Sequence, residues 1–168
     1  MNNIKYWMHL FVLYIIQLMI LDNMQFHSYI CINIYILAIL LLPYHYKKTP
    51  ILLLGFLFGL IIDLANNTMG IHAAATTFIA YLRPRLLLMI YNRDQIDNIQ
   101  GAKKVNSFNW FFKYILFLTF AFNIVLIMAE AFTFDNIAIT LLRIVCSTVA
   151  SCFFMVLYYF IALKKKQD

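Results

Sequence analysis

Charged residues are scarce in this chain of 168 residues: they make up 12% of it, against 64% hydrophobic residues. Soluble globular domains carry roughly 25% charged residues, so the composition argues against that class. The apolar residues instead come in repeated runs of membrane-spanning length, separated by short polar stretches. This pattern is typical of a helical protein that crosses a membrane several times. The sequence predicts one all-α, polytopic membrane domain over residues 1–168.

Motifs for catalysis and for metal or nucleotide binding are also lacking. The chain has no P-loop, GxGxxG, HExxH or GxSxG motif, and its histidines and carboxylates do not pair at a ligand spacing. Its three cysteines, Cys31, Cys146 and Cys152, lie within apolar runs without CxxC spacing. We interpret them as small buried side chains. We therefore expect no soluble catalytic domain, no metal and no cofactor.

Six apolar runs predict six transmembrane helices in a compact bundle. The second and third runs are short and need flanking residues or a locally thinner bilayer, whereas the last is long enough to tilt or to extend into the cytoplasm. The first run lacks alanine, glycine and a small-x-small cleavage site, so we expect a retained anchor and not a signal peptide. The expected spans are about residues 4–21, 29–42, 51–64, 71–91, 111–128 and 137–163, with an inner connector over residues 92–110.

Lysine and arginine predict the orientation. If both termini lie inside the cell, 12 of the 13 basic residues fall on inner segments and none on the outer connections, as the positive-inside rule requires. Topology therefore explains the net charge of +6, and we expect no nucleic-acid binding. The lysines at residues 164–166 are placed to contact membrane lipid headgroups.

Glycine is scarce as well, and three of the four glycines lie between residues 55 and 70. Gly55, Gly59 and Asp63 share one helical face, because each four-residue step advances about 400°. Glycines on such a face let another backbone approach closely. The next run starts at Gly70, which we expect in a left-handed or capping conformation. It again carries small residues at three- and four-residue spacing, Ala73, Thr76, Thr77 and Ala80. We predict a tight hairpin whose small faces pack against helices or partners.

Four ionisable residues, Asp63, His72, Glu130 and Arg143, are expected in the outer half of the bilayer. Arg143 is the one basic residue outside the positive-inside pattern. A charge at that depth costs roughly 2.5 to 3.5 kcal/mol and needs a partner. Either Asp63 or Glu130 can serve, and our hypothesis is a pair between Arg143 and Asp63. The four residues form either a structural polar clasp, which we favour, or a ligand or proton site.

The Arg83-Pro84-Arg85 sequence lies at the expected inner end of the fourth run. Proline removes an amide donor and disfavours helix at the preceding residue, so a kink or a stop is expected there. Both arginines are expected to reach the headgroups at the membrane interface.

The stretch GFLFGLIIDLANNTMGIHAAATTFIAYLRPR, residues 55–85, resembles the family of rod-shape-determining MreD proteins of bacterial cell-wall elongation. The resemblance is carried by G-x3-G-x3-D, a short turn, G-hydrophobic-H-A, and a small apolar helix ending in AYLRPR. It implies a structural or partner-binding role for Gly55, Gly59, Asp63, Gly70 and His72. Outside the hairpin the chain is unusually rich in isoleucine, tyrosine, phenylalanine and asparagine, so the contacts of its other helices are not carried over.

The resemblance implies a non-enzymatic subunit of the bacterial inner membrane. Such a subunit binds the single-span protein MreC and works with RodA, its transpeptidase and the MreB filament. The family is similar in architecture to the substrate-binding subunits of energy-coupling-factor vitamin transporters, and a small-molecule transport subunit is the alternative. Those subunits dock through alanine-rich faces of the first span, whereas residues 5–21 here are bulky. A third possibility is an intramembrane enzyme that uses Asp63, His72 or Glu130.

Overall fold

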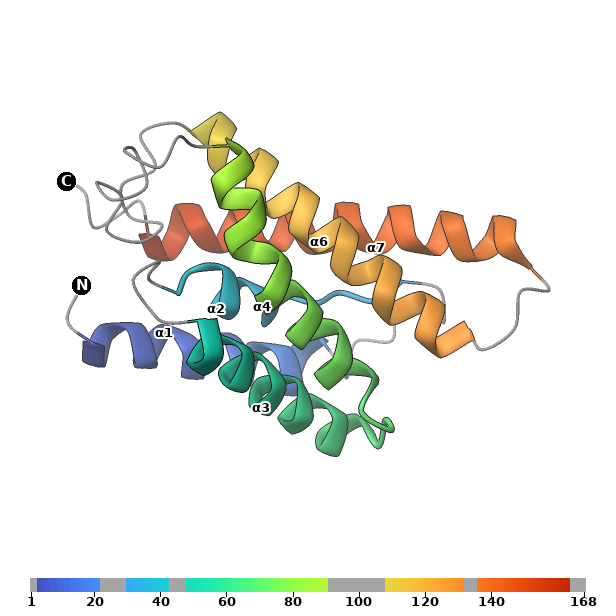
Figure 1. The fold of residues 1–168 in the computed structure, drawn as a ribbon, viewed down its shortest axis with the longest axis horizontal. Helices are drawn as coiled ribbons and strands as arrows, with labels where there is room; N and C mark the ends of the chain where they lie inside the picture. Colours follow the sequence, from blue (N-terminus) through green and yellow to red (C-terminus); the bar gives the residue numbers. More distant parts are fainter. Residues whose placement is uncertain (1–2, 22–29, 43–47, 91–107, 132–135, 164–168) are drawn as a thin grey trace.

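The computed structural model describes residues 3–21, 30–42, 48–90, 108–131 and 136–163 (Figure 1). This part of the chain contains helices, short turns and one longer non-helical stretch at residues 30–34, and no strand, so the predicted all-α class is confirmed for it. The elements are α1 (Asn3–Ile16), a π-helical turn (Gln17–Leu21), α2 (Ile36–Leu40), α3 (Lys48–Asn66), α4 (Ile71–Ile90), α6 (Phe108–Ala131), α7 (Ile137–Tyr158) and a second π-helical turn (Tyr159–Leu163).

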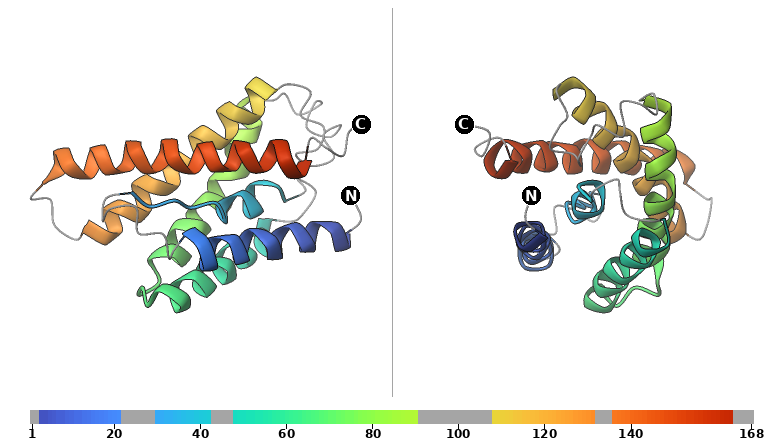
Figure 2. Two further views of the ribbon diagram at one scale, coloured as in Figure 1. Left: turned by 180° about the vertical axis from the view of Figure 1, so that it is seen from behind. Right: turned by 60° about the vertical axis from the view of Figure 1, so that its left-hand side comes forward.

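Six segments run in alternating directions between two ends of the molecule. They are α1, residues 30–42, α3, α4, α6 and α7, and Figures 1 and 2 show that α1 begins at the end where α7 finishes. Three of the helices are long and apolar enough to cross a membrane, over Thr49–Asn66, Phe111–Ala131 and Ile137–Ile161. In lipid the backbone must satisfy its own hydrogen bonds, which favours helices in such apolar runs.

The distribution of polarity on α7 is the reverse of that on a helix of a soluble protein. Along α7, Leu142, Val149 and Phe153 are each more than 60% exposed, whereas Ser147 and Ser151 on the same helix are fully buried. Polar groups inside and apolar groups outside suit a protein whose surroundings are hydrocarbon.

The prediction of a second helix over residues 29–42 is wrong for most of the residues that the structure describes there. Residues 30–34 are not helical, and α2 contributes only five residues (Figure 2, left). This segment lies at the centre of the bundle, where Tyr35 is fully buried and contacts Phe122 edge-on, with ring centroids 6.0 Å apart.

The boundaries of the other helices are close to those expected. The short third run gains flanking residues at both ends and becomes the 19-residue α3. The fourth run does not stop at Pro84, because α4 continues to Ile90. The predicted inner connector covers residues 92–110. Residues 92–107 of it lie outside the described part of the chain, and α6 begins at Phe108.

Candidate functional site: the central hairpin and the polar interior

Helices α3 and α4 form the predicted hairpin, and its glycines are the points of closest approach. A Cβ atom on Gly59 would lie 2.2 Å from Thr76 Oγ1 and 2.5 Å from Ala73 Cα, so no side chain fits there. At Gly55 a Cβ would lie 3.0 Å from Ala80 Cβ, which is tight but less severe. Thr76 also donates a hydrogen bond to the Gly55 carbonyl oxygen across the interface, at 2.8 Å.

The small faces of the hairpin therefore face each other. Ala73 and Ala80 are almost completely buried, while Thr77 is half-buried and donates to the Ala73 carbonyl of its own helix. Of the two alternatives for this face, packing against a helix or against a partner, the structure shows the first at Gly55 and Gly59, where α4 covers both glycines.

The hairpin turn has the conformation that its sequence predicts. Asn67 adopts a left-handed backbone with φ of 55°, and the Thr68 N–H bonds back to the Asp63 carbonyl oxygen at 3.0 Å. This is the Schellman arrangement that ends many helices. Gly70 has φ of 80° as expected, and a Cβ there would meet nothing within 4 Å, so its role is conformational.

Asp63 binds the start of α4 and does not pair with Arg143. Its carboxylate accepts hydrogen bonds from the backbone N–H groups of His72 at 3.0 Å and Ala73 at 2.8 Å, and from the Thr68 hydroxyl at 2.5 Å. The first N–H groups of a helix have no partner within it and carry partial positive charge, so a carboxylate there is strongly favoured. The hypothesis of an Arg143–Asp63 pair is therefore wrong.

His72 joins the hairpin to the central segment. Its Nδ1 atom lies 2.9 Å from the Tyr35 hydroxyl, and both side chains are buried. Because Tyr35 directly precedes α2, this hydrogen bond fixes the position of α2 relative to the start of α4.

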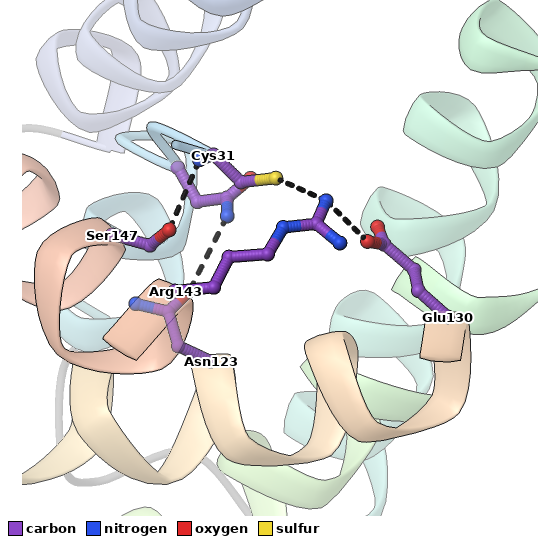
Figure 3. Close-up of polar contacts among 6 residues, drawn as sticks. Cys31, Asn123, Glu130, Arg143 and Ser147 are labelled. Carbon is purple, nitrogen blue, oxygen red and sulfur yellow. Dashed lines mark hydrogen bonds and ion pairs between the residues drawn. The ribbon is translucent and has the colours of Figure 1, made fainter. Parts of the chain in front are cut away.

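Arg143 pairs with Glu130, the other counter-ion considered. Arg143 Nη2 lies 3.0 Å from Glu130 Oε2 and 3.4 Å from Cys31 Sγ (Figure 3). About a quarter of each charged side chain is exposed. The predicted clasp is thus two separate groups: Asp63 with His72, and Glu130 with Arg143.

The non-helical residues 30–34 are held on both sides by side chains. On one side, Ser147 and Ser151 of α7 accept from the backbone N–H groups of Cys31 and Asn33, each at 3.0 Å. On the other side, the Gln17 amide accepts from the Ile34 N–H at 2.8 Å and donates to the Ile32 carbonyl at 2.9 Å. We call these three side chains the clamp.

The geometry of the clamp suits an extended backbone. Successive residues face opposite sides, as in a strand, so that Cys31 and Asn33 bond to α7 while Ile32 and Ile34 bond to Gln17. Serines four residues apart on a helix are separated by a rise of about 6 Å, which nearly matches the roughly 6.6 Å between alternate residues of a strand. The clamp therefore replaces the hydrogen bonds that a helix would have made for itself.

Further buried polar groups brace the same segment. Asn123 of α6 accepts from Asn33 Nδ2 at 3.4 Å and donates to the Thr148 hydroxyl at 3.0 Å. Figure 3 shows Cys31 and Ser147 beside this group, with Arg143 reaching past them toward Glu130. Polar side chains of three elements thus meet around one short stretch of backbone.

Arg83 is buried within the bundle, contrary to the expectation that it reaches lipid headgroups. Its guanidinium donates to the Leu42 carbonyl oxygen and, at 3.0 Å, to the Tyr114 hydroxyl, which itself lies 3.3 Å from the Leu40 carbonyl. Arg83 and Tyr114 therefore satisfy the carbonyl groups of Leu42 and Leu40 at the end of α2. Arg85 is exposed, with its guanidinium carbon 4.4 Å from the Tyr81 ring centre.

None of the three clamp residues is predicted from the sequence. Gln17, Ser147 and Ser151 are polar residues within apolar runs, and the two serines stand at helical spacing. That signal could have marked them as buried, but it does not reveal that their partner is backbone.

The arrangement as a whole binds backbone groups of its own chain. Among the described residues, no group of three or more His, Cys, Asp and Glu side chains could hold a metal ion. No protein-family model matches the chain, and no curated protein or solved structure matches it either.

Proposed function

We propose that the chain crosses the membrane six times, with both termini on the inner side. The helix α1 with its π-helical turn and the helix α4 are each about 30 Å long by their residue counts, the thickness of the hydrocarbon core. Arg85 and Lys113 are exposed, in the last two turns of α4 and the first two turns of α6, and these parts of the two helices lie toward the end where α1 begins. Positive charge at that end supports its placement inside the cell.

The function that we propose is that of a non-enzymatic adaptor in the cell-elongation machinery of a bacterial inner membrane. The observation that carries this proposal is how the MreD-like motif is used. Gly59 admits α4, Asp63 caps it, and His72 ties it to Tyr35. Every one of these contacts braces the fold, as expected of a protein that presents a rigid surface to partners.

The partners that this role implies are MreC directly, and RodA, its transpeptidase and the MreB filament directly or through MreC. The exposed apolar side chains of α3, α6 and α7 would face lipid or partner helices. Close van der Waals packing drives association of helices in lipid, so binding of this kind needs no charged residue on that surface.

The transport alternative is less well supported. Its docking mode requires small residues on the outer face of the first span, but the exposed residues of α1 and its π-helical turn include Met8, Phe11 and Met19, each more than 60% exposed. The carbonyl groups of Leu42 and Leu40, at the end of the central segment, also already accept hydrogen bonds from Arg83 and Tyr114. In many carriers such carbonyls bind the coupling ion.

Depletion of the protein in rod-shaped cells tests the proposal. We expect the cells to become round, and re-expression of the full chain to restore rods. Affinity purification in a mild detergent should recover MreC with the tagged chain, and a Thr140→Ala chain should recover as much, because the Thr140 hydroxyl bonds only to the backbone of residue 136. Normal rods after full depletion, or recovery of a transport ATPase in place of MreC, would contradict the proposal.

A further inference from the structure

The length of the central segment differs between its present form and a helix. Residues 30–42 as one helix would rise only about 20 Å, well short of the hydrocarbon thickness of about 30 Å. With residues 30–34 extended, the same stretch covers close to 30 Å. The extended form thus lets a run that is too short for a helix cross a membrane of ordinary thickness.

The segment is also ready to become a helix. Helical hydrogen bonding already starts at the Ile34 carbonyl, which accepts from Leu37 N–H at 2.9 Å. Elongating an existing helix adds one hydrogen bond for each residue fixed, without a new nucleus. The backbone N–H group of Ile34 would then exchange the Gln17 amide for the carbonyl of Ile30, four residues earlier, while the N–H groups of Cys31 and Asn33 would join the first turn of the lengthened helix.

The clamp is the part that resists this change. Its three residues come from two helices on opposite sides of the segment, α7 and the π-helical turn that follows α1. Such π-helical turns are frequent at functional sites. Here the turn begins at Gln17, the residue whose amide binds two backbone groups of the segment at once.

We propose that residues 30–42 form an adjustable crossing, extended and clamped in thick bilayers and wound into a longer α2 in thin ones. The driving force is hydrophobic mismatch, which is relieved by any element that can change its length. The inference rests on the proposed membrane crossings but not on the adaptor role. A change of length in this segment would move Tyr35 and, through its hydrogen bond, His72 and the hairpin. The position of the hairpin would then depend on bilayer thickness.

A distance measurement in bilayers tests the proposal. Spin labels would be attached at Ile30 and Met89, because both residues are exposed. The attachment chemistry would not use cysteine, because Cys31 is a native free cysteine beside the first label. The labels lie toward opposite ends of the bundle. Winding residues 30–34 should shorten their separation by up to about 9 Å. Labels at Ile139 and Met89 form the control pair, since neither lies on the segment.

The purified full chain would be measured in short-chain and long-chain phosphatidylcholine bilayers by double electron-electron resonance. We expect the Ile30–Met89 distance to be shorter in the thin bilayer and the control distance to change by much less. A Gln17→Leu, Ser147→Ala, Ser151→Ala chain should show the short distance in both bilayers, whereas Thr140→Ala should behave as wild type. An unchanged Ile30–Met89 distance in the wild type, or a clamp variant that is unfolded or keeps the long distance, would overturn the proposal. Cell shape and MreC recovery do not enter this measurement, so it can fail while the adaptor function stands.

Discussion

The hairpin of α3 and α4 and the central segment of residues 30–42 solve the same problem in opposite ways. Both place backbone deep inside the bundle. In the hairpin, glycine stands where a larger side chain would collide, so that α3 and α4 lie in close contact at Gly55 and Gly59. In the central segment polar side chains are added, so that Gln17, Ser147 and Ser151 reach its backbone. One region is stabilised by contact between two complete helices, and the other by replacing the hydrogen bonds of a helix that did not form.

This difference decides which substitutions each region tolerates. A close helix contact fails when volume is added, because neighbouring backbone cannot move far. A set of hydrogen bonds fails gradually, because membrane side-chain bonds contribute on average only about 0.6 kcal/mol each. We therefore expect the largest losses of stability in the hairpin and smaller ones in the clamp.

Adding one methyl group at Gly59 should have the largest effect. We expect Gly59→Ala to lower the free energy of unfolding by about 3 kcal/mol, because the new Cβ collides with the Ala73 backbone. Gly55→Ala should cost clearly less, since its nearest contact is the Ala80 methyl group. Thermal unfolding in detergent, followed by circular dichroism, measures both. Equal losses at the two glycines would contradict the assignment of Gly59 as the closest contact.

Removing the cap of α4 should have the next largest effect. Asp63→Ala leaves the His72 and Ala73 N–H groups without their acceptor, and we expect a loss of about 2 kcal/mol. Asp63→Asn should lose less, because the amide oxygen can still accept one of these bonds. The same unfolding measurement tests this order, and a more severe loss for Asp63→Asn would mean that the carboxylate is not a cap.

The clamp should respond more mildly. We expect Gln17→Leu to cost about 1 kcal/mol, because two side-chain hydrogen bonds to backbone are lost. Thr140→Ala on α7 is the matched control and should be almost neutral, since its hydroxyl bonds only to its own helix. A loss from Gln17→Leu as large as that from Gly59→Ala would remove the distinction between the two regions.

The smallest expected effect on the free energy of unfolding is that of the ion pair between Arg143 and Glu130. A double-mutant cycle on Arg143 and Glu130 should give a coupling of about 0.5 kcal/mol, because the pair is partly exposed. The cycle on Arg143 and Asp63 should be additive, since Asp63 is bound to α4 instead. Coupling in the second cycle and none in the first would show that the charges are paired differently.

The hairpin could be predicted because its signal is local. Small residues at fixed spacing on consecutive runs, together with turn residues between them, indicate close packing, and Gly70 and Asn67 adopt the conformations that such a turn requires. The helix ends of α4 and α7 are also within a few residues of those expected. Apolar periodicity and turn chemistry are sufficient for these features.

The central segment could not be predicted because its partners are distant in the chain. Cys31 and Ser147 are 116 residues apart, and nothing near residues 30–34 indicates a break in the helix. Arg83 was misplaced for a related reason: an arginine near the end of a span usually reaches the headgroups, but here Tyr114 and the Leu42 carbonyl lie within its reach. For Asp63 the sequence suggests a charged partner, Arg143. In the structure its carboxylate instead accepts from the backbone N–H groups at the start of a helix nine residues later.

The most direct test of the account is the behaviour of Asp63→Asn in rod-shaped cells depleted of the native protein. If the motif residues act only by holding the hairpin together, cell shape should follow the amount of folded protein in the membrane. Asp63→Asn chains that accumulate to the wild-type level should then restore rods, as Thr140→Ala should. Round cells that contain wild-type amounts of folded Asp63→Asn protein would contradict the account, because the carboxylate would then have a function beyond capping α4.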